Sequence, residues 1–383
     1  MGSPDPGGRQ ISGLGGGVSS LSKAMIIGLP GEGRKEQRAF GDLPGPAWAD
    51  EGSRDGVPYD LVYRSATCGN MLAAVALSAL STPILPYSQL FERARALRRG
   101  WSNDEPIMLP LSILSASNSA ILRARVPIDP ISLQPWDPPP GQGEKIAGVP
   151  EEGAGIELET PLQADDGSSG LVTGQVRNDV DVEGKRFAHQ YGVSIVSAGL
   201  PNIFVDIKQF QVEPELITAS AETLTSHPTL LESIESLRQA TATACGIPIS
   251  LASPKVTVLG RLPPQGYISS NGSSVARSDA DLVARAISSG DWHRTIPGTT
   301  LSALNVAAGI PGTLVHEMIA GPAANAQLTA YGTSDITIRA AHEAGVTQST
   351  VRFEDGKPQS VVLVRTARQI MCGEVMVPER VFM

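Results

Sequence analysis

The stretch Cys68-Gly69-Asn70-Met71-Leu72-Ala73-Ala74-Val75 places a thiol and a glycine directly before an apolar run. Its small and straight-chain residues predict a helix over about 70–80. At such a helix start, free backbone N–H groups and the positive end of the helix dipole stabilise a thiolate. Cys68 is therefore a candidate base or nucleophile, and the alternative is a buried structural cysteine at a strand-to-helix turn.

A second copy of this pattern lies in the other half of the chain. The stretch Pro297-Gly298-Thr299-Thr300-Leu301-Ser302-Ala303-Leu304 aligns with residues 68–75, matching Gly69 with Gly298 and Leu72 with Leu301. The repeat predicts two homologous halves, each a curved sheet around one apolar helix, with the two helix N-termini facing a cleft. Two such N-termini would form an anion site.

The repeat is asymmetric at its first residue, where Pro297 stands opposite Cys68. Proline cannot exchange a proton, which argues against a racemase with two opposed thiols. Lys23 is the candidate for a second proton carrier, because a lysine desolvated among glycines and serines can act as a base. The alternative for Lys23 is a surface lysine at the start of a strand. The neighbouring Gly-rich segment 13–17 and the hydroxyls of Ser19, Ser20 and Ser22 could bind an anion.

Composition excludes several classes of protein. The chain has 383 residues, a formal charge of −9 and a pI near 5.2, so no basic surface is expected for a nucleic acid or an anionic membrane. Its three cysteines are far apart and its five histidines show no ligand spacing, which predicts neither a disulfide framework nor a metal site. With no long apolar run and no signal-peptide pattern, we expect a cytoplasmic protein.

The pattern of apolar residues predicts an α+β fold of curved, mostly antiparallel sheet. Helices are expected over about 70–80, 229–245 and 300–309. A further amphipathic helix is expected over 278–289, with Ser278-Asp279 as its N-cap. Short strands are expected at 24–27, 59–63, 120–126, 193–197, 202–207, 255–259, 335–340, 360–365 and 374–377. We expect two domains, 1–175 with 366–383 and 176–365.

Several segments together resemble one known family, the PrpF-like isomerases, which have the diaminopimelate epimerase fold. The likeness lies in Gly2–Lys23, in Cys68–Val75, in Ala198-Gly199-Leu200-Pro201 with Phe204-Val205, in Pro254-Lys255-Val256, in Ile310–Val315 and in Arg365–Pro378. These segments follow the family's order over nearly the whole chain.

The resemblance implies an intramolecular isomerase that moves a C=C bond by allylic proton transfer, without cofactor or metal. Its substrate would be a small unsaturated polycarboxylate of the aconitate, methylitaconate or oxalomesaconate type, and the protein could form a homodimer. The family's lysine and cysteine map onto Lys23 and Cys68, either of which could be the base. Lys255 and Arg365 could reach substrate carboxylates, although a partly buried salt bridge would explain either one equally well. The substrate-binding residues expected are Ser19, Ser20, Ser22, Gly69, Asn70, Gly298, Thr299, Thr300 and Lys255.

Three departures from the family pattern leave an alternative open. The chain begins inside the first motif, without the opening strand pair; Thr67 replaces an asparagine; and Tyr331-Gly332-Thr333-Ser334 stands where His-Pro-Ser-Gly is frequent. The alternative is a non-catalytic or truncated relative that binds such acids or assists an aconitase-like enzyme. Racemisation or epimerisation is a third hypothesis, and Pro297 argues against it.

Overall fold

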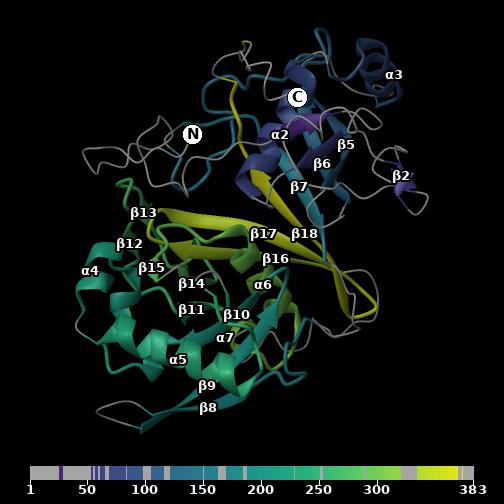
Figure 1. The fold of residues 1–383 in the computed structure, drawn as a ribbon. Helices are drawn as coiled ribbons and strands as arrows, with labels where there is room; N and C mark the ends of the chain where they lie inside the picture. Colours follow the sequence, from purple (N-terminus) through teal and green to yellow (C-terminus); the bar gives the residue numbers. More distant parts are fainter. Residues whose placement is uncertain are drawn as a thin grey trace, which may run out of the picture. The chain divides into compact units, whose positions relative to one another are not determined.

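A computed structural model of the chain forms two compact units (Figure 1). The first contains Met1–Pro138, Ala154–Leu158 and Thr366–Met383, and the second contains Pro139–Gly153 and Glu159–Arg365. The predicted domain boundaries differ from these units at residues 139–153 and 159–175. The prediction places these residues in the first domain, whereas the structure has them in the second unit. The structure describes residues 26–28, 53–54, 57–58, 61–64, 69–82, 84–97, 105–115, 121–149, 151–162, 170–183, 188–227, 229–250, 253–288, 290–320, 334–369 and 373.

The first unit is a sheet with two helices. Its strand order is β1-β4-β5-β6-β7, with β4 parallel to β5 and the pairs β1–β4 and β5–β6 antiparallel. Helix α2 packs against β6 and α3 against β5, around a core that includes Leu72, Val75, Leu109 and Val126. The elements are β1 (Ile26–Gly28), β2 (Ser53–Arg54), β3 (Val57–Pro58), β4 (Leu61–Arg64), α2 (Gly69–Ser81), α3 (Tyr87–Leu97), β5 (Ile107–Ser115), β6 (Ile121–Ile128) and β7 (Ile156–Pro161), whose residues from Glu159 on are counted in the second unit.

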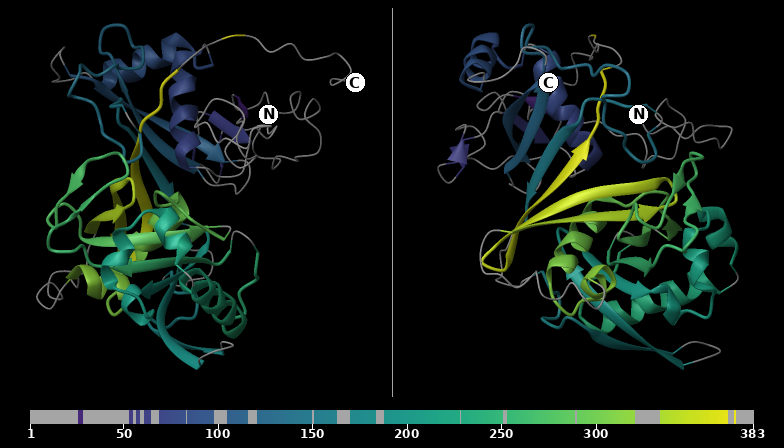
Figure 2. Two further views of the ribbon diagram at one scale, coloured as in Figure 1. Left: turned by 90° about the vertical axis from the view of Figure 1, so that its left-hand side faces the viewer. Right: turned by 180° about the vertical axis from the view of Figure 1, so that it is seen from behind.

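The second unit is a larger curved sheet whose strand order is β18-β17-β16-β14-β11-β10-β9-β8. Its long strands β16, β17 and β18 can be followed in Figure 2. Only β10–β11 and β14–β16 are parallel among the described pairs of this sheet. The strands are β8 (Asn178–Glu183), β9 (Ala188–Ser197), β10 (Pro201–Asp206), β11 (Lys255–Gly260), β12 (Tyr267–Ile268), β13 (Ser274–Val275), β14 (Leu282–Ser288), β15 (Asp291–Trp292), β16 (Ser334–His342), β17 (Gly345–Glu354) and β18 (Lys357–Arg365).

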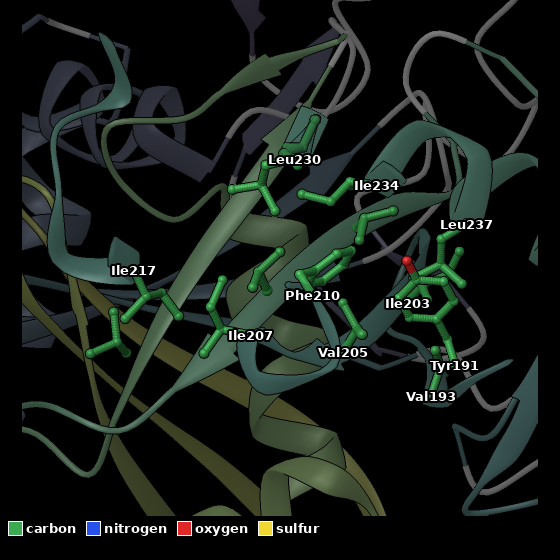
Figure 3. Close-up of a cluster of buried hydrophobic side chains, with 14 of the residues drawn as sticks. Tyr191, Val193, Ile203, Val205, Ile207, Phe210, Ile217, Leu230, Ile234 and Leu237 are labelled. Carbon is green, nitrogen blue, oxygen red and sulfur yellow. The ribbon is translucent and has the colours of Figure 1, made fainter. Parts of the chain in front are cut away.

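The helices of this unit cover both faces of the sheet. They are the 3₁₀ helices η2 (Ile207–Gln209) and η3 (Pro214–Thr218), and the α-helices α4 (Ala221–Ser226), α5 (Leu230–Ala244), α6 (Gly298–Gly309) and α7 (Leu314–Ala320). On one face, Leu230, Ile234 and Leu237 of α5 share a buried apolar cluster with Ile203 and Val205 of β10 (Figure 3). Alternate residues of β10 point to opposite faces, so Phe204 belongs to the core around α6 instead.

Helix α6 is the centre of the second unit. All of its residues from Thr300 to Ala308 are buried, and it contacts β9, β10, β16, β17 and β18. A sheet can contact one helix through five strands only if it curves around that helix. The predicted α+β class, with mostly antiparallel sheet curved around a central helix, is confirmed here.

The helix predicted over 278–289 is wrong, because this segment contains strand β14. β14 lies between β11 and β16 and is buried from Leu282 to Ile287, including the charged Arg285, so neither of its faces is exposed to solvent. A strand buried on both faces shows no polar alternation, and its apolar spacing can imitate that of a helix. Asp279 accepts from the N–H of Ala276 at 2.8 Å in a turn before the strand.

Other predicted elements are close to the observed ones. The helices at 70–80, 229–245 and 300–309 correspond to α2, α5 and α6, and the strand at 255–259 corresponds to β11. The strand predicted at 374–377 lies outside the described residues. None of the helices in the described ranges is long and apolar enough to cross a membrane.

Candidate anion site at the start of helix α6

The first turn of α6 offers free backbone donors. Its N-cap is Pro297, whose side chain makes no capping hydrogen bond, and the N–H of Leu301 donates to the Pro297 carbonyl at 2.9 Å. The N–H groups of Gly298, Thr299 and Thr300 therefore have no acceptor within the helix. A helix N-terminus with uncapped N–H groups is suited to hold an anion.

Lys255, the first residue of β11, reaches this turn from the sheet. Its side chain is 8% exposed, and its Nζ donates to the Thr299 hydroxyl at 2.9 Å. Among the described residues no carboxylate lies within 4.0 Å of that ammonium group. Burial lowers the pKa of Lys255 below its usual value. The salt bridge that would explain Lys255 structurally is thus not found in the described part of the chain.

The charge arrangement at this place costs folding energy. An ammonium group favours the C-terminal end of a helix, and here it lies at the N-terminal, positive end. A buried cation without a counter-ion adds a desolvation penalty. Both costs are relieved if an anion binds between Lys255 and the N–H groups of α6, which makes this a functional-site candidate on physical grounds.

The neighbouring threonine is held from the adjacent strand. The Thr300 hydroxyl donates to Asn202 Oδ1 at 3.0 Å, and Asn202 Nδ2 donates to the Leu200 carbonyl at 3.1 Å. Asn202 and Lys255 are paired residues in the parallel register of β10 and β11. Two neighbouring strands thus hold two consecutive threonines of one helical turn.

Gly199 completes the surroundings of this turn. It lies between β9 and β10 with a φ of +93°, a left-handed conformation that favours glycine, and a Cβ built there would lie 3.8 Å from Thr299 Cγ2. Space would therefore permit a Cβ at this position, and it is the positive φ of the β9–β10 turn that favours glycine beside the α6 N-terminus.

The structure brings together only part of the predicted site. Gly298, Thr299, Thr300 and Lys255 lie at one place, and because the hydroxyl of Thr300 is engaged by Asn202, Thr300 has only its first-turn N–H to offer an anion. Gly69 and Asn70 open α2, directly after Cys68, as the repeat predicted for both helix starts. The other expected residues, Lys23, Cys68, Ser19, Ser20 and Ser22, lie outside the described residues.

Asn202 is the residue that the sequence reasoning missed. It follows the Ala198–Pro201 motif directly, and its position after a glycine-proline turn was the available signal. Arg365, at the end of β18, has a pKa lowered by burial and donates from Nη1 to the Val364 carbonyl at 2.8 Å. Within the described ranges, no three His, Cys, Asp or Glu side chains gather in a way that would hold a metal ion.

Comparison with known proteins gives the chain its family. A family model described as PrpF protein matches residues 1–378. A 2-methyl-aconitate isomerase from Shewanella oneidensis is 28% identical over 395 residues, covering 99% of this chain and 87% of the relative. A 3-methylitaconate isomerase from Eubacterium barkeri is 31% identical over 251 residues, covering 61% of this chain and 59% of the relative.

A solved structure shows the same fold. The crystal structure of methylitaconate-delta-isomerase superimposes with a TM-score of 0.64 at 22% sequence identity, covering 93% of this chain and 92% of that one. The fold likeness and the match of the family model run over nearly the same length of chain. This chain belongs to the PrpF family.

Proposed function

We propose that this protein is an isomerase of small unsaturated di- or tricarboxylic acids, which moves a C=C bond by allylic proton transfer without a cofactor. The relatives named as 2-methyl-aconitate and 3-methylitaconate isomerases support this substrate class. The structural observation that supports the proposal is the buried Lys255 ammonium at the N-terminus of α6, which has no carboxylate within 4.0 Å among the described residues. This ammonium and the N–H groups of the first turn of α6 are donors that a substrate carboxylate could accept from.

The reaction needs two proton transfers and a place for charge. One proton leaves the carbon next to the double bond, giving a dienolate whose charge is shared with a carboxylate, and one proton returns at the other end of the three-carbon unit. We assign these transfers to Lys23 and Cys68, with either one as the base. The N–H groups of Gly298 and Thr299 and the Lys255 ammonium would stabilise the carboxylate that takes up the charge.

Proton exchange in deuterated water tests the proposal. The purified full chain is incubated with cis-aconitate, trans-aconitate and methylitaconate, and deuterium uptake at the allylic carbons is followed by NMR. Uptake is expected with at least one acid. Absence of uptake with all three, in a folded protein, would contradict the isomerase for these substrates and leave a binding protein as the better description.

Two variants test the assigned residues. Cys68→Ser and Lys23→Ala should each lower the exchange rate by at least ~100-fold if they carry protons. Cys245→Ser is the matched control, because the Cys245 thiol is half-buried at the end of α5 and burial raises its pKa. The Cys245→Ser protein should catalyse exchange of substrate protons at the wild-type rate. Wild-type rates in both test variants would show that the proton carriers are other residues.

A further inference from the structure

We propose that Asn202 is a positioning residue: it holds the first turn of α6 and thereby sets the affinity of the anion site that this turn forms. The inference rests on the proposed function, because it concerns the same carboxylate. Asn202 itself does not contact the substrate in this role.

The side chain of Asn202 is fixed at both ends. Asn202 and Thr300 are both 0% exposed, and the hydrogen bond between Thr300 Oγ1 and Asn202 Oδ1 joins residues 98 positions apart in the sequence. The amide group of Asn202 is tied back to the β9–β10 turn through the Leu200 carbonyl. The first turn of α6 is therefore anchored to the sheet by a buried, oriented amide.

This anchor replaces an ordinary helix cap. A serine, threonine, asparagine or aspartate at the N-cap accepts from an N–H of the first turn and so occupies a donor that an anion could use. Pro297 offers no such acceptor. Asn202 instead holds the turn through the Thr300 hydroxyl, which leaves the N–H groups of residues 298–300 free for a ligand.

The two threonines have opposite hydrogen-bond directions. The Lys255 ammonium can only donate, so the Thr299 oxygen accepts from it and the Thr299 proton remains available to an anion. The single hydroxyl proton of Thr300 is already given to Asn202. Thr299 thus binds the anion directly while Thr300 holds the helix.

Deleting the anchor should weaken the binding of a carboxylate at the first turn of α6. Asn202→Leu and Thr300→Val remove the two partners, and each should raise the dissociation constant for tricarballylate, a saturated tricarboxylate that cannot isomerise, by about tenfold. KM for the substrate should rise by a similar factor, and kcat should fall as well, because the same turn stabilises the carboxylate that takes up charge in the dienolate. Thr300→Ser keeps the hydroxyl and should restore affinity to within ~2-fold of wild type.

Asn305→Leu is the matched control. Asn305 is also buried on α6, and its amide donates to Leu301 O at 2.8 Å and to Ser349 Oγ, so its loss removes a comparable buried amide farther along the helix. It should destabilise the protein without changing tricarballylate affinity. Equal loss of affinity in Asn305→Leu and Asn202→Leu would overturn the proposal, because a general loss of stability would then explain both.

Amide hydrogen exchange provides a readout that needs no turnover. The Leu301 N–H forms the first hydrogen bond of α6, to the Pro297 carbonyl. Its exchange should be faster in Asn202→Leu and Thr300→Val than in the wild-type protein, and Thr300→Ser should exchange at the wild-type rate. Unchanged exchange would overturn the positioning role. A wild-type protein that binds tricarballylate but isomerises no acid would contradict only the isomerase, whereas one that does not bind it would overturn the role of Asn202 too.

Discussion

Two buried cations of the second unit, Arg285 and Lys255, differ in the groups that surround their charge. Arg285, 1% exposed, donates from Nη2 to Glu343 Oε2 at 3.1 Å and from Nη1 to the Ile217 and Ala219 carbonyls. Lys255 donates to the Thr299 hydroxyl and lies at the positive end of a helix, with no carboxylate within 4.0 Å among the described residues. The charge of Arg285 is thus compensated by Glu343, whereas that of Lys255 would be compensated by the ligand proposed above.

Replacing Lys255 should therefore separate stability from binding. Lys255→Met keeps the aliphatic stem and removes the buried charge, so the free energy of unfolding should rise by ~1 kcal/mol. Affinity for tricarballylate should fall at least ~10-fold, as measured by isothermal titration calorimetry. Lys208→Met, at an exposed lysine of η2, is the control and should change neither quantity. Loss of stability in Lys255→Met would instead indicate a structural lysine.

The depressed pKa of Lys255 gives this residue a pH signature. At alkaline pH the unfolded chain binds a proton that folded Lys255 has lost, so the stability penalty of the buried charge is relieved as pH rises from the folded pKa to the usual lysine value. Tricarballylate affinity should decline over the same rise, because the anion prefers the ammonium form. Lys255→Met should lack both changes, which pH-dependent titration and urea unfolding would measure.

Single residues were predictable from the sequence only where a motif marked them. Lys255 and Thr299 were found from the family's segments and the repeat, and their side chains meet. Asn202 was not found, because the partner that explains it lies 98 residues away and a single sequence contains no trace of that contact. The same applies to the ion pair between Arg285 and Glu343, which are 58 residues apart.

At the scale of elements, the close approach of α6 to β17 depends on one glycine. A Cβ at Gly309 would lie 2.0 Å from Phe353 Cζ, far inside van der Waals contact, and Phe353 is buried. Alanine favours a helix over glycine by up to ~1 kcal/mol, but this clash is more costly. Gly309→Ala should therefore lower the free energy of unfolding by ~1–3 kcal/mol.

A double-mutant cycle checks this cause. Phe353→Leu shortens the opposing side chain, so adding Gly309→Ala to it should cost less than the same change in wild type. The measurement is the urea midpoint of the four proteins. Strictly additive losses would mean that Gly309 matters for a reason other than contact with Phe353.

Elements were predictable where their local pattern agreed with their final surroundings. α5 has one buried face and polar residues on the other, and its predicted range of 229–245 nearly equals the observed Leu230–Ala244. β14 was predicted as a helix because its neighbours on both faces, unknown from the sequence, bury every residue from 282 to 287. Burial on both faces removes the alternation that distinguishes a strand.

At the scale of the whole molecule, the repeat correctly placed the first residues of two helices in two separate compact units. α2 begins at Gly69 and α6 at Gly298, the two glycines that the repeat matched. The repeat could not reveal how the second unit is held together away from α6. Besides the apolar cluster under α5, Arg285 and Glu343 contribute there, and they connect three segments far apart in the sequence.

Glu343 should therefore be one of the residues on which the stability of the second unit most depends. Its Oε2 accepts from the Ala221 N–H at 2.9 Å, at the start of α4, and from Arg285 in β14. Glu343→Gln keeps the shape and part of the hydrogen bonding but leaves the Arg285 charge buried and uncompensated, since arginine cannot lose its proton. We expect a loss of ~3–5 kcal/mol in the free energy of unfolding.

A nearby exposed pair provides the comparison for this loss. Glu222 and Arg294 lie 3.4 Å apart with side chains 84% and 67% exposed, and Arg294 also lies 3.9 Å from Glu343. Glu222→Gln should cause no measurable change, because water screens an exposed pair. Urea unfolding of Glu343→Gln and Glu222→Gln in the full chain measures the two losses in the free energy of unfolding. A small effect in Glu343→Gln would mean that water or a shifted carbonyl solvates Arg285, so that the ion pair does not hold the three segments together.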